Sequence, residues 1–305
     1  MKKISVVAIV LLMVAAPAFA ATNDPYFARL WGLHRVGAEP AWAASKGAGV
    51  MIAVIDTGVD TNHPDLQGKL LPGYDFVSND AVPKDEEGHG TLVAGIAGAL
   101  TGNKVGIASI APDAKILPVR VFDGTGNGNS NTVADGVNYA IKEAGDRNMR
   151  LVLNFSFVPE GPTSGSSFFA DPKLELAVRS AINAGAALVI AAGNSGANQT
   201  AYDSTNAEIV VVGASDKSDN RASLSNYGAG LDILAPGIDI TSTYWDKATG
   251  NSVYASAQGT STSVPFVSGA AALLMAKGMN GKAALNKILE HRVATMTPVT
   301  ACSIS

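Results

Sequence analysis

The chain has 305 residues, of which 47% are hydrophobic and 16% charged, and this balance indicates a folded globule and excludes a largely disordered chain. Its formal net charge is −4, or −6 without Lys2 and Lys3, so its charge does not favour nucleic acid or an anionic membrane surface as a partner. The single cysteine, Cys302, excludes an internal disulfide, and we interpret it as an inert or dimer-forming thiol rather than a nucleophile.

The first twenty residues have the pattern of a secretory signal peptide. Lys2 and Lys3 precede an apolar run over residues 4–16, and the small-residue pattern at residues 18–20 predicts cleavage near Ala20. A membrane anchor is the alternative, but the run is short for a span and Pro17 interrupts it. We therefore expect a secreted protein with one domain over residues 21–305 and no recognisable propeptide.

From residue 31 onwards the chain predicts alternating elements, beginning with surface helices between Trp31 and Trp42. Short apolar runs bounded by Gly, Asn, Asp or Pro predict buried strands at residues 50–55, 116–121, 151–155, 187–192, 209–212 and 231–235. Apolar residues at helical spacing predict helices at residues 92–100, 132–143, 174–183, 264–277 and 283–291. This alternation indicates an α/β fold, a mostly parallel central sheet with helices on both faces.

Three short glycine-bearing segments, far apart in the chain, each contain one chemically active side chain. Asp56 lies in I-D-T-G, His89 in G-H-G-T and Ser261 in G-T-S. A serine nucleophile needs an imidazole to accept its proton and a carboxylate to orient that imidazole. Ser261 also precedes a run of small residues that predicts a helix, whose N-terminus favours a developing oxyanion. On its own Ser261 could be a simple helix cap, but the three segments together favour nucleophilic catalysis.

These segments resemble those of the subtilisin-like serine proteases. The residues are I-D-T-G-V-D at 55–60 with H-P-D-L after it, H-G-T-L-V-A-G at 89–95 and G-T-S-T-S-V-P at 259–265, in the family's order Asp, His, Ser. The resemblance covers residues 23 to about 277. It implies a subtilisin-like α/β fold and serine endopeptidase activity on protein and peptide substrates, with Asp56 orienting, His89 as general base and Ser261 as nucleophile.

The same resemblance implies an oxyanion site and a substrate cleft. A-A-G-N-S-G at residues 191–196 is similar to the family's A-A-G-N-x-G stretch, which gives Asn194 the role of oxyanion donor and places Gly193 beside the substrate. The two edges of the cleft are expected at Gly126, Asn127 and Gly128 and at Ser156, Phe157 and Val158. A peptide would lie between these edges as an added strand.

The sequence departs from the family pattern at several of these positions. Ser156-Phe157-Val158-Pro159 stands where S-L-G-G or S-W-G is usual, so Val158 adds bulk beside the expected specificity pocket and Pro159 removes a donor. Thr262, Ser263, Phe266 and Leu92 replace other usual residues near the active groups. None of these changes removes a catalytic atom, so we expect altered specificity or rate with the same mechanism.

The start of the predicted mature chain, N-D-P-Y-F, resembles that of a family member in which an N-terminal aspartate, the aspartate of H-P-D-L and a surface loop bind calcium. The corresponding calcium ligands here are the carboxylates of Asp24 and Asp65, the side-chain oxygen of Asn103 and the carbonyls of Leu100, Val105 and Ile107. Calcium favours such mixed oxygen ligands. The alternative is that both aspartates are solvated turn residues.

Two other functions remain to be weighed. An aspartic protease also uses Asp-Thr-Gly, but it needs two such aspartates in a β-rich fold, and this chain has one in an α/β pattern. A catalytically impaired member of the family that binds peptides is the second alternative, motivated by the altered residues around Ser261. The sequence favours an active enzyme, and we interpret it as a monomer.

Overall fold

A computed structural model describes residues 5–7, 22–158, 171–198 and 208–294 of the chain. The described strands are β1 (Ser5–Val7), β2 (Val50–Asp56), β3 (Tyr74–Asp75), β4 (Lys115–Arg120), β5 (Arg150–Phe155), β6 (Ala187–Ala191), β7 (Ile209–Ser215), β8 (Ile233–Pro236), β9 (Ile240–Asp246), β10 (Asn251–Ala257) and β11 (Arg292–Ala294). The described helices are η1 (Phe27–Arg29), α1 (Trp31–Arg35), α2 (Ala38–Ala41), η2 (Pro64–Leu66), α3 (His89–Gly98), α4 (Ser130–Asp146), α5 (Pro172–Asn183), α6 (Thr260–Met275) and α7 (Gly281–Glu290).

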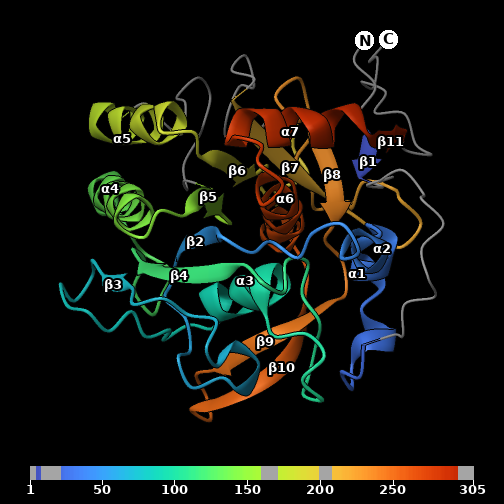
Figure 1. Cartoon of the computed structure of the whole chain (residues 1–305), viewed down its shortest axis with the longest axis horizontal. Helices are drawn as coiled ribbons and strands as arrows, with labels where there is room; N and C mark the ends of the chain where they lie inside the picture. Colours follow the sequence, from blue (N-terminus) through green and yellow to red (C-terminus); the bar gives the residue numbers. More distant parts are fainter. Residues whose placement is uncertain (1–4, 8–21, 159–170, 199–207, 295–305) are drawn as a thin grey trace.

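The centre of the molecule is a sheet whose described strands lie in the order β11-β1-β8-β7-β6-β5-β2-β4-β3 (Figure 1). The strands from β8 to β3 are parallel to their neighbours, and only β11 pairs in the antiparallel sense. All six predicted strands are present as β2 and β4–β8, and all five predicted helices are present as α3–α7. The predicted α/β fold with a mostly parallel sheet is therefore confirmed.

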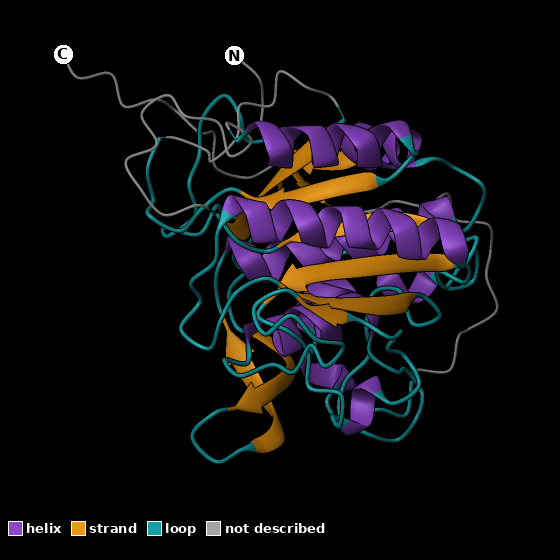
Figure 2. Cartoon of the chain, turned by 90° about the vertical axis from the view of Figure 1, so that its left-hand side faces the viewer, coloured by secondary structure: helices purple, strands orange, loops and turns teal. Residues whose placement is uncertain are grey.

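Helices cover both faces of the sheet. Successive residues of each central strand point to opposite faces, and because nearly all of them are apolar, both faces must be buried. On β2, Ile52 belongs to one buried core with α3, α6 and α7, whereas Met51 belongs to the other core with α4 and α5. The layered arrangement is visible in Figure 2. A strand buried on both faces needs a continuous apolar sequence, and V-M-I-A-V-I provides it.

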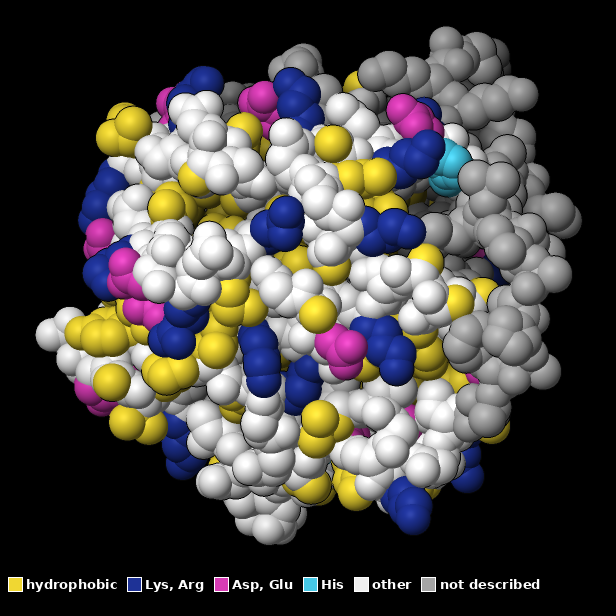
Figure 3. Space-filling model, viewed as in Figure 1, with side chains coloured by type: hydrophobic (Ala, Val, Ile, Leu, Met, Phe, Trp, Pro, Cys, Tyr) yellow, Lys and Arg dark blue, Asp and Glu magenta, His cyan; other side chains and the backbone are white. Residues whose placement is uncertain are grey.

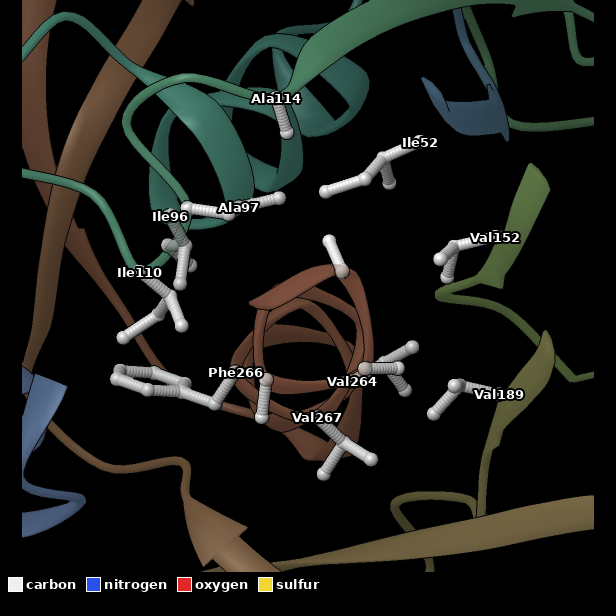
Figure 4. Close-up of a cluster of buried hydrophobic side chains, with 14 of the residues drawn as sticks. Ile52, Ile96, Ala97, Ile110, Ala114, Val152, Val189, Val264, Phe266 and Val267 are labelled. Carbon is white, nitrogen blue, oxygen red and sulfur yellow. The ribbon is translucent and has the colours of Figure 1, made fainter. Parts of the chain in front are cut away.

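Helix α6 lies at the centre of one of these cores, between the sheet and α3. In Figure 4, Val264 and Val267 of α6 lie among side chains from the sheet, from α3 and from the segment before β4. Gly269 allows this close packing, because a Cβ there would lie 2.5 Å from Ile110 Cβ. Small and apolar residues around the whole helix therefore predict and explain its burial.

The predicted start of this helix was too late. The sequence predicts a helix from residue 264, whereas α6 begins at Thr260, so Pro265 lies in the second turn. Pro265 has no N–H to donate to the carbonyl of Ser261, and the Ser156 hydroxyl donates to that carbonyl instead, at 2.9 Å. This replacement explains how a proline is accommodated inside the helix.

The hairpin of β9 and β10 was not predicted. Its strands are rich in Ser and Thr and are only partly buried, so they lack the apolar pattern used to predict the other strands. The hairpin packs against α3, where the hydroxyl of Thr243 donates to the carbonyl of Thr91 at 2.7 Å. It therefore supports the helix that carries His89.

The predicted signal sequence overlaps one described element. Ser5–Val7 forms β1, which pairs with β8 and β11 at one side of the sheet. Cleavage near Ala20 would remove β1 and leave the pairing of β8 through β3 unchanged. The expected cleavage site, Pro159 and Cys302 lie outside the described residues. No helix in the described ranges has the length and apolar character needed to cross a membrane.

Candidate active site

Asp56 and His89, separated by 33 positions in the chain, meet at the carboxyl end of the central strand. Asp56 is the last residue of β2 and is 1% exposed, and its Oδ1 accepts hydrogen bonds from His89 Nδ1 and the Thr57 N–H, both at 2.8 Å. His89 is the first residue of α3. In this tautomer the imidazole donates through Nδ1, which leaves Nε2 free to act as a base.

The charges around His89 favour its protonated form. Burial lowers the pKa of His89, but the charge of Asp56 and its hydrogen bond, together with the charges of Glu87 and Asp85, outweigh this effect and raise the pKa to about 9. The side chain is 31% exposed, so Nε2 remains open to a ligand. The imidazole can therefore accept and hold a proton, as a general base must.

Ser261 is the only residue of α6 that is not buried. It lies in the first turn of the helix, and its N–H and Oγ have no hydrogen-bond partner among the described residues. Gly259 precedes the helix with φ of +148°, a backbone conformation that side chains rarely allow. The helix thus presents one free hydroxyl and one free N–H at its positive end.

Asn194 lies opposite this helix end in a fixed orientation. Its Oδ1 accepts hydrogen bonds from the N–H of Thr260 at 2.8 Å and the hydroxyl of Thr260 at 3.0 Å. A Cβ on Gly259 would lie 3.4 Å from Asn194 Nδ2 and 3.2 Å from Ser261 Oγ, which shows that both groups border the same small space. Within the described chain Nδ2 has no acceptor, so it remains available as a donor.

These groups lie in one cleft of about 640 Å³. Among the predicted cleft residues, Gly126, Asn127 and Gly128 line one part, and Ser156, Phe157 and Val158 line another. Other residues that line the cleft were not predicted: Thr57, Glu87, Phe122, Thr125, Asn129, Ser130, Val133 and Leu174. His89 Nε2 and Ser261 Oγ are not hydrogen-bonded to each other, and such contacts often tighten only when substrate binds.

Gly193 has a different position from the one expected. It is buried and does not line the cleft. Its N–H donates to the hydroxyl of Thr260 at 3.1 Å and its carbonyl accepts from the N–H of Asn226 at 2.9 Å. Both backbone groups of Gly193 therefore have partners within the protein, and its role in substrate binding stays a prediction.

Asp85 is a buried residue whose role the sequence did not indicate. Its carboxylate accepts from the hydroxyl of Thr57 at 2.9 Å and from the N–H and hydroxyl of Thr91 at 2.9 and 2.6 Å. Two more bonds come from the N–H groups of Glu87 and Gly88. Burial raises the pKa of Asp85, and these bonds oppose that rise. The carboxylate joins the turn after Asp56 to the start of α3.

The six predicted calcium ligands lie around one loop. Asp24 and Asp65 are buried, and their carboxylates accept N–H groups from Gly102, Asn103 and Ile107 of that loop. Neither forms an ion pair with a cationic side chain in the described residues. Burial raises the pKa of Asp65. Two buried carboxylates around one loop are ligands of the type that calcium favours, although the described residues contain no cluster of three or more His, Cys, Asp or Glu that could hold a metal.

The fold and the cleft together define a class of protein. A buried carboxylate bonded to an imidazole, in one cleft with a free hydroxyl at a helix N-terminus, is the arrangement of a serine hydrolase. An aspartic protease needs two Asp-Thr-Gly segments in a β-rich fold. The chain has one such segment, and the described residues form an α/β fold, so this alternative is excluded.

Comparison with known proteins identifies the family. Residues 47–297 match the Subtilase family, and the chain belongs to that family. Thermitase from Thermoactinomyces vulgaris is 43% identical over 257 residues, covering 84% of this chain and 86% of that protein. Subtilisin Savinase from Lederbergia lenta is 42% identical over 248 residues, covering 81% and 84%. These relatives confirm the resemblance inferred from the sequence motifs.

A solved structure gives the same result for the fold. A protease from Pseudoalteromonas arctica superimposes with a TM-score of 0.77 at 29% identity, covering 88% of this chain and 91% of that one. The family and its named serine proteinases establish this protein as a serine endopeptidase, and they do not favour the alternative of an impaired peptide-binding protein.

Proposed function

We propose that Ser261, His89, Asp56 and Asn194 carry out the endopeptidase reaction. Ser261 Oγ attacks the carbonyl carbon of the scissile peptide bond while His89 Nε2 accepts its proton. Asp56 holds the imidazole through Nδ1 and stabilises the positive charge that forms there. The negative charge on the carbonyl oxygen is stabilised by Asn194 Nδ2 and the Ser261 N–H.

The same groups complete the reaction. The tetrahedral intermediate collapses, the C–N bond breaks, and His89 gives its proton to the leaving amine, which leaves an acyl ester on Ser261. A water molecule then attacks the ester carbonyl as His89 accepts its proton. The C–Oγ bond breaks and His89 returns that proton to Oγ, which releases the acid and restores the serine hydroxyl.

One observation carries this assignment: in a helix whose other residues are all buried, the single accessible side chain is a hydroxyl in the cleft that also contains His89. A serine that served only as a helix cap would have its hydroxyl bonded to a backbone N–H, and Ser261 Oγ has no such bond among the described residues. The free Asn194 Nδ2 nearby completes the donor set that the reaction needs.

The assignment is tested by hydrolysis of casein and of short peptides by the wild-type protein and by Ser261→Ala. The variant should retain its fold by circular dichroism and lose measurable hydrolysis. Ser263→Ala is a matched control, because Ser263 is buried in the same helix and its hydroxyl bonds to the carbonyl of Ala235 at 3.0 Å. Full activity in Ser261→Ala would reject the proposed nucleophile.

Substrates would bind as an extended peptide between the segments at Gly126–Gly128 and Ser156–Val158. Both segments line the cleft, and pairing through the main chain accommodates many sequences. Val158 is half-buried against the core and lines the same cleft as Ser261, so its side chain takes space within that cleft. This supports a preference for small side chains next to the scissile bond.

We also propose calcium binding by Asp24 and Asp65 with the amide oxygen of Asn103 and the carbonyls of Leu100, Val105 and Ile107. When bound, calcium would neutralise the two buried carboxylates and stabilise the loop.

Export through the predicted signal peptide, with cleavage near Ala20, would place the protein where calcium is abundant. Basic and acidic side chains both occur on the face shown in Figure 3. The net charge of −4 does not favour nucleic-acid substrates, and we propose a monomer.

A further inference from the structure

The turn that carries Asn194 is held by a residue distant in the chain, Asn226. Asn226 is 6% exposed and lies in the segment between β7 and β8. Its Oδ1 accepts from the Ser195 N–H at 3.0 Å, the Ser195 hydroxyl at 2.9 Å and the Ala197 N–H at 3.1 Å. Its Nδ2 donates to the carbonyl of Ala192 at 3.2 Å. One carboxamide thus bonds to residues on both sides of Asn194.

The backbone reinforces the same contact. The N–H of Asn226 donates to the carbonyl of Gly193 at 2.9 Å. Gly193 has φ of +108°, and a Cβ there would lie 2.3 Å from Asn226 Nδ2. Because Gly193 has no side chain, the Asn226 carboxamide can occupy this space. The two residues therefore pack directly against each other.

The segment that carries Asn226 is itself anchored. Ser225 Oγ accepts from the Ala214 N–H of β7 at 3.0 Å, and the guanidinium of Arg221 lies 4.6 Å from the centre of the Tyr227 ring and donates to the carbonyl of Ser225. Asn226 therefore connects the exposed turn to a segment that is bonded to the sheet, and this restricts the movement of the turn. An oxyanion donor needs such support, because a displacement of about 1 Å can lower a rate about 100-fold.

We infer that Asn226 is a positioning residue for the oxyanion donor: it fixes the backbone of the Asn194 turn while Thr260 fixes the Asn194 carboxamide. The inference rests on the proposed role of Asn194. Asn226 does not line the cleft and so acts only through the turn. Loss of its side chain should weaken stabilisation of the transition state and leave substrate binding nearly unchanged.

A double-mutant cycle with Asn226→Ala and Asn194→Ala tests this. Rates are expressed per active site, titrated with a serine-reactive phosphonate, so that misfolded protein does not count. Asn226→Ala should lower kcat about tenfold with KM within about twofold. Asn194→Ala should lower kcat about 10²–10³-fold, and the double variant should be no slower than Asn194→Ala alone.

Two further variants separate positioning from general loosening. Lys217→Ala changes an exposed residue of the same segment, paired with Asp239 and without contact to Asn226 or the turn, and it should leave kcat nearly unchanged. Ser195→Ala changes an exposed side chain, removes one of the bonds to Asn226 and should lower kcat about twofold to threefold, which keeps the test decisive if Asn226→Ala does not fold.

The inference is overturned if the losses from Asn226→Ala and Asn194→Ala multiply in the double variant, or if Asn226→Ala retains full kcat. Should Asn226→Ala not fold, full kcat in Ser195→Ala, or an equal loss from Ser195→Ala with and without Asn194, would overturn it. A wild-type protein without hydrolysis or phosphonate labelling would instead reject the proposed function itself.

Discussion

The Thr57 hydroxyl donates a hydrogen bond to Asp85 Oδ1 over 2.9 Å, and this bond connects the residue after Asp56 to the segment before His89. Thr57 Oγ1 in turn accepts from the Gly90 N–H at 3.0 Å. The segments that carry Asp56 and His89 are therefore held together by a buried carboxylate as well as by the direct bond between these two residues.

Asp85→Ala should lower both stability and activity. The change leaves several buried donors without an acceptor, so the free energy of unfolding should fall by about 3 kcal/mol. Chemical denaturation measures this best in the Ser261→Ala background, which prevents self-digestion. Asp113→Ala, at an exposed residue, should change the free energy of unfolding by less than about 0.5 kcal/mol. Equal stability of the two variants would show that the Asp85 network has no structural role.

Asp56→Asn should lower kcat about 10⁴-fold while KM changes little, because the amide would no longer hold the imidazole in the tautomer that leaves Nε2 free. Steady-state kinetics on a chromogenic peptide measures both constants. Asp60→Asn changes another buried aspartate of the same segment that does not contact His89, and it should retain most of the activity. Comparable losses in the two variants would contradict the orienting role of Asp56.

Activity should rise with pH through the pKa of His89, which the neighbouring carboxylates raise to about 9. The base must be neutral, so kcat/KM should be highest at alkaline pH. Glu87→Gln removes one charge that raises this pKa and should move the rising limb to lower pH. Glu86→Gln is the control, because Glu86 pairs with Arg120 at 2.6 Å. A maximum below about pH 5 would contradict the role of His89.

The stability of the fold should respond to pH in the opposite direction from activity. Because the pKa of His89 is raised above its ordinary value of 6.5, its protonated form stabilises the fold fully below pH 6.5, and this contribution is lost as pH rises through about 9. The free energy of unfolding of Ser261→Ala should therefore decline over this window, and the decline should be shallower when His89→Ala is added. Identical slopes would show that His89 is not coupled to Asp56 in solution.

Calcium should stabilise the protein through Asp24 and Asp65. At a concentration one hundred times its dissociation constant, calcium should raise the free energy of unfolding by about 2.7 kcal/mol, and a chelator should reverse this. Asp65→Asn should abolish the effect, whereas Asp135→Asn, at a surface residue paired with Lys173, should preserve it. Scanning calorimetry in the Ser261→Ala background provides the measurement, and an equal response in both variants would exclude the proposed ligand.

The sequence predicted what depends on local pattern and left out what depends on contacts between distant segments. The strand ending at Asp56 and the helix containing Ser261 follow from continuous apolar runs and small residues. The β9–β10 hairpin lacks such a pattern because it is only half-buried. Asp85 and Asn226 were missed because their importance lies in bonds to residues about 30 positions away, which no local motif reports.

The position of Gly193 shows the same limit. The structure places the Asn194 turn beside Ser261, but the motif around Asn194 does not indicate which of its residues face the cleft. That depends on Asn226, whose carboxamide occupies the space below Gly193. A close approach between two segments can be recognised only once both are placed in the fold.

The central claim is that His89 and Asp56 activate Ser261, and labelling with a fluorophosphonate probe followed by peptide mapping tests it most directly. We predict a single adduct, on Ser261, formed rapidly in the wild-type protein, strongly slowed in His89→Ala and absent in Ser261→Ala. A folded, calcium-loaded protein that hydrolyses peptides yet carries no adduct on Ser261, or that labels equally fast without His89, would contradict the account.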